Sequence, residues 1–345
     1  GFMCAKEFRE GLRTLNVELT AEEEEKLFDT VDVGRDGQVD LHEWLDGISP
    51  ASPASGALFA SRVQILKSSG LNALSDNEQK QLASMLNRLE RVAAYADSKG
   101  VKLLVDAEQT YMQPAIDHLT LQLMQRYNQH SPVVFNTYQC YLVDSFKRVV
   151  ADIDRAQRQG FVFAAKMVRG AYMVQERRLA RLRGYPDPIH LNIQATHDNY
   201  NAVIEMVLRY KAAPATHETG TLQRRSTAVM LASHNEKSVE RAVRLMGELG
   251  IPRSDSGVYF GQLQGMCDHV SYLLGQKEYA VYKYLPYGPV KEVMPYLLRR
   301  AEENGDLMSG VWKERKMMSS ELKRRAFDAF RLGGKSKGDS YGVAH

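Results

Sequence analysis

The sequence has little of what defines several large classes of protein. Its three cysteines, Cys4, Cys140 and Cys267, are odd in number, far apart and without metal-ligand spacing. This argues against a disulfide framework and favours a reducing compartment. No apolar run approaches the roughly 18 residues of a membrane span, and a net charge of +3 is too small to indicate nucleic-acid binding. With 44% hydrophobic and 25% charged residues among 345, the composition is that of a globular protein with a full-sized core.

Two further absences narrow the enzyme classes. No Gly-x-Gly-x-x-Gly turn follows any predicted strand, which argues against a dinucleotide-binding fold. Nothing resembles the spacing of a zinc site, and no nucleophile elbow is present to hold a Ser/His/Asp triad. The chemistry must therefore come from other residues or from a cofactor.

The segment from Asp32 to Glu43 resembles the calcium-binding loop of an EF-hand, with a glycine at loop position 6 and a glutamate at position 12. Gly34 and Arg35 depart from the pattern and weaken calcium binding, so a metal-free structural EF-hand stays open as the alternative. The five candidate Ca²⁺ ligands are Asp32, Asp36, Gln38, Asp40 and Glu43.

Four regions follow from the pattern along the chain. Residues 1–50 form an EF-hand-like segment, and because Gly1–Phe8 fits the second half of a preceding loop, we expect the chain to begin inside a motif of a longer polypeptide. Residues 51–98 form a linker and a helical bridge, residues 99–322 a barrel, and residues 323–345 a tail. Within the bridge, Asp76–Ser98 is a predicted helix with Ser75 or Asp76 as its N-cap.

From residue 101 onward, short apolar strands alternate with amphipathic helices. This is the pattern of parallel βα units in an α/β protein. Six strands are recognisable, at 101–108, 133–138, 161–170, 227–235, 257–262 and 280–284. Polar residues follow the strands, as in a (βα)8 TIM-type barrel, which would need eight strands. An open doubly wound sheet is the structural alternative.

The strand ends carry the candidate chemistry. Asp106 and Glu108 share one face of their strand and need cationic partners if buried, for which Arg299, Arg300, Lys166 and Arg169 are available. Lys166 is costly to bury unless it contacts an anion or an electron-rich cofactor such as a flavin. His234 and Asn235 open a helix and suit either a phosphate or a helix cap.

A second cluster lies on the helix that follows the last strand. Tyr296, Arg299 and Arg300 stand at i, i+3 and i+4 and share one helix face. Two guanidiniums beside an aromatic ring make a socket for a small carboxylate. The alternative is an exposed arginine pair answered by Glu302 and Glu303.

Seven motifs, in this order, resemble those of the proline dehydrogenases of the animal mitochondrial type. They are Asp106–Glu108, Phe135–Gln139, Lys166–Tyr172, Ala232–Glu236, Phe260–Cys267, Tyr282–Pro289 and Pro295–Arg300. The resemblance implies a distorted (βα)8 barrel that binds FAD and oxidises L-proline to Δ1-pyrroline-5-carboxylate. It also implies a membrane quinone as electron acceptor, a mitochondrial location and peripheral contact with the inner membrane.

The resemblance also assigns roles to residues. Arg299 and Arg300 would hold the proline carboxylate, Tyr284 and Tyr296 would enclose its ring with Leu263 against it, and Asp106 would organise the arginines. The implied catalytic residues are Asp106, Tyr284, Arg299 and Arg300. Asn136 and Lys166 would contact the flavin ring. The remaining implied FAD contacts are Val168, Arg169, Gly170, Ala171, Ser233, His234 and Asn235.

Other interpretations stay open. The family's first two strands are not recognisable in this sequence. Tyr284 favours proline over 4-hydroxyproline, because a tyrosine crowds the 4-hydroxyl, so 4-hydroxyproline oxidation is the alternative activity. A calcium-binding regulatory or structural protein with an inactive barrel is the alternative from another class. The basic helix Lys313–Arg331 is a candidate membrane contact, and no function follows for the polar loop Ala213–Ser226.

Overall fold

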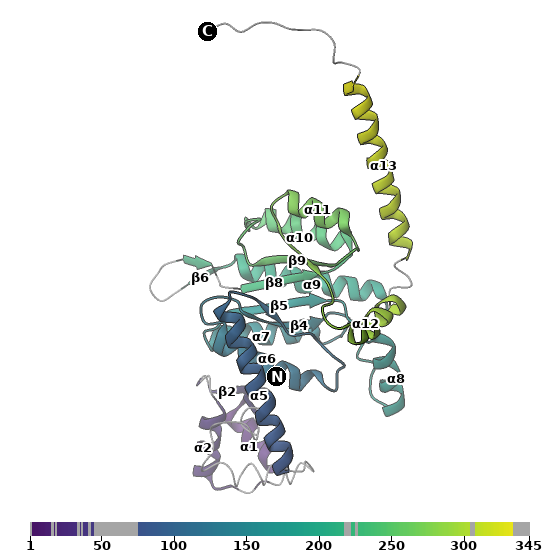
Figure 1. Ribbon diagram of the computed structural model, residues 1–345. Coiled ribbons are helices and arrows are strands. Elements are labelled where there is room, and N and C mark those ends of the chain that lie inside the picture. The colour runs from purple at the N-terminus through teal and green to yellow at the C-terminus, as the bar shows by residue number, and fades with distance from the viewer. Residues whose placement is uncertain are drawn as a thin grey trace. The chain divides into compact units, whose positions relative to one another are not determined.

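The computed structural model describes residues 2–14, 17, 19–32, 35, 37–40, 43–44, 75–216, 222–224, 227–303 and 308–333. The chain divides into two compact units, Gly1–Val229 and Met230–His345, and each is described by itself (Figure 1). Among the described helices, none is both long and apolar enough to cross a bilayer. Residues 51–74 of the predicted linker and bridge and residues 334–345 of the predicted tail lie outside the described residues.

The first unit opens with a small helical layer closed by a strand pair. Its elements are β1 (Phe2–Cys4), α1 (Ala5–Thr14), α2 (Ala21–Val31) and β2 (Gln38–Asp40). β1 and β2 pair antiparallel, with Met3 opposite Val39. A buried apolar cluster centred on Phe8 and Phe28 fills the space between the helices, and Trp44 packs against it.

Helix α5 (Asp76–Ser98) follows, with the bounds that the sequence predicted. Ser75 is its N-cap: the hydroxyl accepts from the Glu78 N–H, while the Glu78 carboxylate accepts from the Ser75 N–H. This reciprocal capping box satisfies two helix-end donors and fixes where the helix begins.

Parallel strands form the core of the rest of the first unit. β3 (Leu103–Leu104), β4 (Val134–Gln139) and β5 (Phe163–Val168) pair in parallel, and every residue of β4 is buried. Its polar residues Asn136, Thr137 and Gln139 are therefore buried together with its apolar ones. The helices of this unit are α6 (Gln113–Tyr127), α7 (Ser145–Arg158), α8 (Met173–Arg183) and α9 (Ile193–Ala212).

The second unit repeats the strand–helix pattern. β9 (Val258–Leu263) and β10 (Ala280–Tyr284) pair in parallel. Its helices are α10 (Glu236–Glu248), α11 (Asp268–Gln276), α12 (Val290–Glu303) and α13 (Met308–Gly333). β8 (Thr227–Ala232) begins in the first unit and ends in the second.

The six predicted strands are present and form one sheet in the order β10-β9-β8-β5-β4-β3. The first is confined to Leu103–Leu104, so Asp106 and Glu108 follow this strand and do not lie on it as predicted. Sequence order runs through this sheet without the reversal that defines a doubly wound fold, so that alternative is wrong. The fold is an α/β fold with a six-stranded parallel half-barrel. Closure into eight strands stays a prediction.

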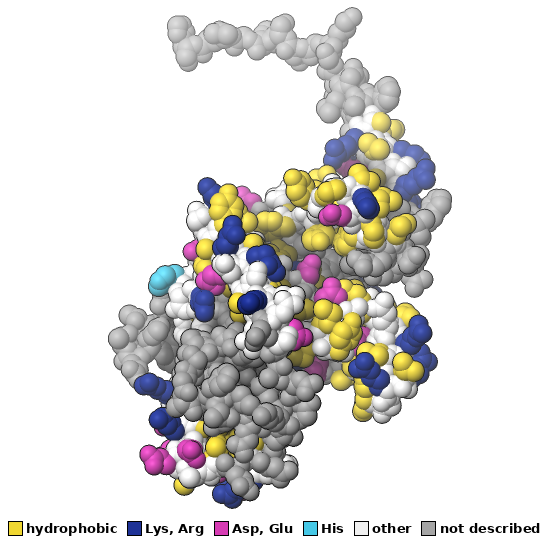
Figure 2. All heavy atoms as spheres, turned by 60° about the horizontal axis from the view of Figure 1, so that its bottom comes forward, with side chains coloured by type: hydrophobic (Ala, Val, Ile, Leu, Met, Phe, Trp, Pro, Cys, Tyr) yellow, Lys and Arg dark blue, Asp and Glu magenta, His cyan; other side chains and the backbone are white. Residues whose placement is uncertain are grey.

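Sequence patterns missed three features. The polar loop from Ala213 to Ser226 contains an antiparallel pair, β6 (Pro214–Thr216) with β7 (Leu222–Arg224). Helices α9 and α11 were also not predicted, although each is well formed. Charges of both signs and apolar side chains are interspersed on the face shown in Figure 2, in keeping with the low net charge.

Candidate functional site

The first group of predicted site residues lies at the ends of strands β3 and β5. Lys166 forms an ion pair with Asp106, and the lysine side chain is only 12% exposed whereas the aspartate is 61% exposed. The sequence had predicted a cationic partner for Asp106, and Lys166 supplies it. Because the carboxylate of this pair is accessible and the ammonium is nearly buried, a ligand at the strand ends can contact the carboxylate.

Asn136 does not share this face. In the parallel register Thr137 stands opposite Lys166, while Asn136 stands opposite Ala165 and so points to the other side of the sheet. The Asn136 amide is fully buried and donates to the Asp117 carboxylate of α6 at 2.9 Å. The prediction that Asn136 contacts a flavin therefore needs correction, because the pleat of β4 turns this side chain toward the helices.

Thr137 and Gln139 occupy the face of β4 that Lys166 shares. The Thr137 hydroxyl donates to the Val105 carbonyl at 2.6 Å, and the Gln139 amide donates to the Glu108 carbonyl at 2.8 Å. These bonds tie β4 to the segment that carries Asp106. Alternation along β4 was the signal that could have separated the two sets of residues.

The turn after β5 is built around Gly170. Its φ is +129°, and a Cβ there would lie 2.3 Å from the Tyr141 ring, so only glycine fits. Beside it, Arg169 donates from Nε to His197 Nδ1 at 2.9 Å, and its guanidinium lies 4.3 Å from the Tyr200 ring centre. Burial lowers the pKa of Arg169. These contacts occupy one edge of the Arg169 guanidinium. We therefore expect the predicted cofactor contacts of Val168–Ala171 to be made mainly by backbone groups.

His234 lies in the second unit, at the end of β8. The Leu263 N–H donates to His234 Nε2 at 3.0 Å, which makes Nε2 an acceptor and assigns the proton of the neutral ring to Nδ1. One hydrogen bond therefore joins two predicted site residues, His234 and Leu263.

The neighbours of His234 shape the start of α10. Asn235 is the N-cap of the helix, since its side-chain oxygen accepts from the Ser238 N–H at 3.0 Å. The Ser233 hydroxyl accepts from the Asn235 N–H at 3.1 Å. The capping interpretation is thus confirmed for Asn235, and cofactor contact by Ser233 and Asn235 stays a prediction.

The predicted substrate residues of the second unit come together at the end of β10. Tyr284 stands opposite Leu263 in the parallel register, and its ring centre lies 6.1 Å from that of Tyr296 at an interplanar angle of 45°. The Tyr284 side chain remains 46% exposed. Arg299 and Arg300 follow Tyr296 on α12 by three and four residues, and their side chains lie outside the described residues.

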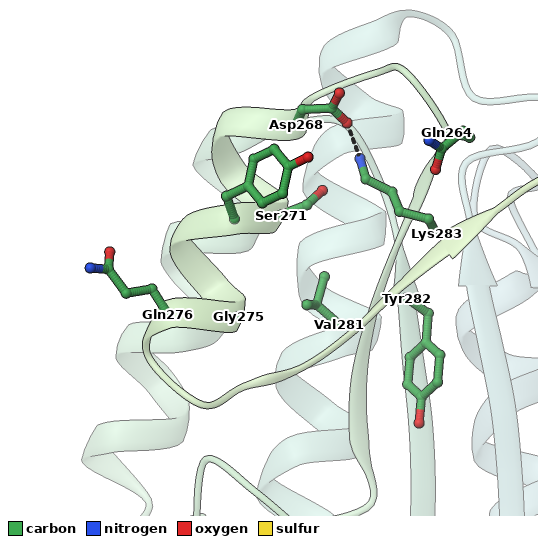
Figure 3. A pocket seen from close by; sticks show the side chains of 9 residues that line it. Gln264, Asp268, Ser271, Gly275, Gln276, Val281, Tyr282 and Lys283 are labelled. Carbon is green, nitrogen blue, oxygen red and sulfur yellow. Dashed lines mark ion pairs between the residues drawn. The ribbon is translucent and has the colours of Figure 1, made fainter. Parts of the chain in front are cut away.

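A hollow of about 330 Å³ opens elsewhere in the second unit, against helix α11 and strand β10 (Figure 3). An ion pair between Asp268 and Lys283, 2.6 Å long, stands at one side of it. None of its lining residues belongs to the predicted site.

The predicted calcium ligands are drawn into other contacts. Asp40 is 5% exposed. Its carboxylate forms ion pairs with two guanidiniums: Arg155 contacts it through Nη2 and through Nε, which lies at 3.0 Å, and Arg158 through Nη2 at 3.1 Å. The Glu43 carboxylate accepts from the Asp40 N–H at 3.0 Å. Two guanidiniums on a ligand carboxylate compete with a cation, so the geometry argues against Ca²⁺ at this loop. 

Asp32 and Asp36 are two further predicted calcium ligands. Asp32 accepts from the Gly37 N–H at 2.8 Å, a bond that closes the first half of the loop. Asp36 lies outside the described residues.

The fold is an α/β half-barrel with polar residues at the carboxyl ends of its strands, which is where proteins of the barrel class keep their ligand sites. The sequence profile named proline dehydrogenase matches residues 16–313. The chain belongs to the proline dehydrogenase family.

Curated relatives agree with this assignment. The chain is similar to the proteins named proline dehydrogenase 1, mitochondrial, of Caenorhabditis elegans (44% identity; 94% of this chain, 52% of the relative) and of Homo sapiens (43%; 92% and 51%). It is also similar to the hydroxyproline dehydrogenase of Xenopus laevis (46%; 76% and 54%). The chain spans about half the length of these relatives.

Among solved structures, the chain is similar to proline utilization A of Bdellovibrio bacteriovorus. The TM-score is 0.57 at 26% identity, over 66% of this chain and 22% of that protein. Proline utilization A of Bradyrhizobium japonicum gives a TM-score of 0.53 at 22% identity, which supports the fold alone.

Proposed function

We propose that the protein oxidises L-proline to Δ1-pyrroline-5-carboxylate with FAD as its cofactor. The observation that carries the proposal, beside family membership, is the meeting of Leu263, Tyr284 and Tyr296 at the end of β10. Two aromatic rings and a leucine form an apolar wall suited to a saturated five-membered ring. The two arginines that follow Tyr296 on α12 are suited to its carboxylate.

The donor set of the first unit fits an anionic flavin cofactor. Lys166 is a nearly buried cation at the end of β5, where positive charge favours the reduced flavin. Gly170, with a φ of +129°, lets the chain turn directly after β5, and we propose the backbone of this turn for contact with the cofactor. When bound, FAD would supply the two-electron chemistry by accepting a hydride from proline C5.

The chain's own residues would bind proline, orient it and shield it from water. Arg299 and Arg300 would fix the carboxylate, and Tyr284 and Tyr296 would exclude water from the ring. Asp106, held by Lys166, would set the charge balance of the first unit's part of the site. Orientation of this kind places the reacting carbon without any side chain having to transfer a proton. His234, with Ser233 and Asn235, would meet the distal part of the cofactor.

Location and electron acceptor follow the relatives. Two of them are named mitochondrial, and we extend that location to this chain, with a membrane quinone as electron acceptor. Helix α13, whose described side chains between residues 315 and 327 are almost all exposed, is the element we propose for peripheral contact with the inner membrane.

The EF-hand-like segment is proposed to be structural. If Met3 and Val39 both occupy loop position 8, their pairing across β1 and β2 is the register of two paired EF-hand loops. This register supports the EF-hand interpretation of residues 1–50, and Asp40 bound to Arg155 and Arg158 supports its metal-free form.

The second candidate is 4-hydroxyproline oxidation, favoured by the 46% identity to the Xenopus laevis hydroxyproline dehydrogenase. Anaerobic titration of the flavin absorbance with L-proline and with trans-4-hydroxy-L-proline separates the two. Bleaching by proline at much lower concentration supports the proposal. Bleaching mainly by hydroxyproline establishes the alternative, and a protein without flavin absorbance refutes both.

Two variants of Tyr284 test its role in the choice between proline and hydroxyproline. Tyr284→Phe keeps the ring and should retain proline oxidation. Tyr284→Ser opens the wall next to Tyr296, and we expect it to weaken proline binding by about 10-fold while improving the relative response to hydroxyproline.

A further inference from the structure

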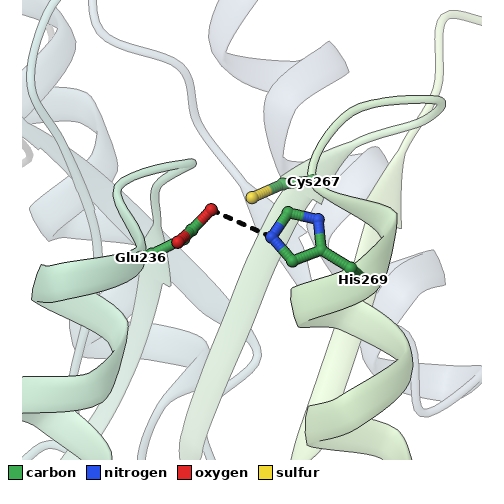
Figure 4. A group of neighbouring side chains, drawn as sticks. All are labelled: Glu236, Cys267 and His269. Carbon is green, nitrogen blue, oxygen red and sulfur yellow. Dashed lines mark hydrogen bonds and ion pairs between the residues drawn. The ribbon is translucent and has the colours of Figure 1, made fainter. Parts of the chain in front are cut away.

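Three side chains of different chemistry meet where helices α10 and α11 begin. Glu236 is the first residue of α10, Cys267 is the N-cap of α11, and His269 lies in the first turn of α11 (Figure 4). A carboxylate oxygen, the sulfur and a ring nitrogen all lie within 4.8 Å of one another. His269 Nε2 is 2.9 Å from Glu236 Oε1. All three residues are half-buried.

Sulfur, imidazole nitrogen and carboxylate oxygen are the donors that Zn²⁺ takes in proteins. Bond lengths of roughly 2.0–2.3 Å in a tetrahedral site place ligand atoms roughly 3.3–3.7 Å apart. The three donors would therefore have to close by about 1 Å, which side-chain rotation can supply. Three protein ligands leave the fourth position open to water or to an added ligand.

The charges around the cluster suit a divalent cation. A thiolate and a carboxylate balance the two charges of Zn²⁺, and both side chains come from residues at the start of α10 and α11. Asp268 lies between two of the donors in sequence but pairs with Lys283 at 2.6 Å. That ion pair engages the Asp268 carboxylate, so Asp268 is not counted among the donors.

The backbone fixes the thiol in place. Cys267 has a φ of +56°, in the left-handed region that side chains rarely adopt. Its carbonyl accepts from the Val270 and Ser271 N–H groups, each at 3.1 Å, and its sulfur lies 3.5 Å from the His234 carbonyl. The turn is thus held by the first bonds of α11, and the sulfur is directed toward α10.

We propose that Glu236, Cys267 and His269 bind one Zn²⁺ ion. The site is distinct from the residues assigned to proline and does not rest on the proposed function. It was invisible in the sequence because Glu236 lies 31 positions before Cys267, and the pair of Cys267 and His269 alone has no zinc spacing.

The test is Zn²⁺ titration of the full chain against a chromophoric chelator, with Co²⁺ as a spectroscopic substitute. We expect one Zn²⁺ per chain and a thiolate-to-Co²⁺ charge-transfer band. Cys267→Ser and His269→Gln should each weaken binding by about 100-fold or more. The matched controls Cys4→Ser, which removes an exposed thiol, and Asp268→Asn should leave both affinity and band unchanged.

A second measurement needs no variant. Zn²⁺ should slow alkylation of Cys267 in the wild-type chain by at least about 10-fold, as read by mass spectrometry of the labelled peptide. The proposal is overturned if Zn²⁺ does not bind, if Cys267→Ser and His269→Gln bind as the wild type does, or if alkylation is unaffected. If Cys267→Ser does not fold, the alkylation rate and His269→Gln decide.

Discussion

Replacing Arg155 by methionine should destabilise the first unit by about 2–4 kcal/mol. Arg155 and Asp40 have side chains 5% and 7% exposed, and removing one partner of a buried ion pair costs roughly 3–5 kcal/mol. Arg158 still reaches Asp40 at 3.1 Å and compensates part of the loss. Methionine keeps most of the volume, so the change measures the lost charge and its two hydrogen bonds rather than a cavity.

Urea unfolding followed by Trp44 fluorescence measures this effect. Trp44 packs at 5.6 Å from Phe8, and Trp312→Phe as the common background removes the second tryptophan. Arg209→Met is the matched control, because that arginine pairs with Glu205 at the surface and should cost less than about 1 kcal/mol. Equal effects of the two substitutions would refute the reasoning.

Asp40→Asn separates the charge from the contact. It keeps a hydrogen-bonding oxygen but leaves the buried Arg155 with Asp152, at 3.8 Å, as its acidic partner. We expect a loss similar to that of Arg155→Met. The double variant should lose less than the sum of the two single changes, by about 1–3 kcal/mol, because each single change removes the same pair. Additive losses would show that Asp40 and Arg155 do not act together.

Three further outcomes follow from the structure. Gly170→Ala should cost more than about 2 kcal/mol and reduce flavin content, because a Cβ collides with the Tyr141 ring; Gly160→Ala, with a φ of +72° and no atom within 4 Å, should cost about 1 kcal/mol in unfolding experiments. Burial raises the pKa of Asp152 to about 6, so the folded state holds more protons than the unfolded state and the unfolding free energy should fall as pH rises from about 4 to about 6; Asp152→Asn should flatten this slope. Chelation of Ca²⁺ should leave the melting temperature and proline oxidation unchanged, and a several-fold change in activity would contradict the metal-free assignment.

The strands and helix α5 could be predicted because their signals are local. The six strands are apolar runs that end in polar residues, and α5 begins at a capping box formed by residues three apart. Part of the apolar wall could also be predicted, because the register of neighbouring parallel strands places Tyr284 beside Leu263.

The contacts that could not be predicted join distant residues. Asp40 and Arg155 lie 115 positions apart. The motif around Asp40 indicated a calcium ligand, and a local motif cannot show that an arginine of a distant helix binds the same carboxylate. The direction of Asn136 was missed for another reason. Alternation along β4 separates Asn136 from Thr137, but the pattern alone does not show which of the two faces the helices.

The two faces of β4 have a consequence for sequence variation. Asn136 and Tyr138 bond to Asp117 on α6 and Asp152 on α7, whereas Thr137 and Gln139 bond to the segment that carries Asp106. Among homologues, the first two positions should co-vary with the helices and the second two with the ligand. A deletion of one residue before Asn136 would exchange the two sets at once, so this strand should tolerate substitution far better than a change in length.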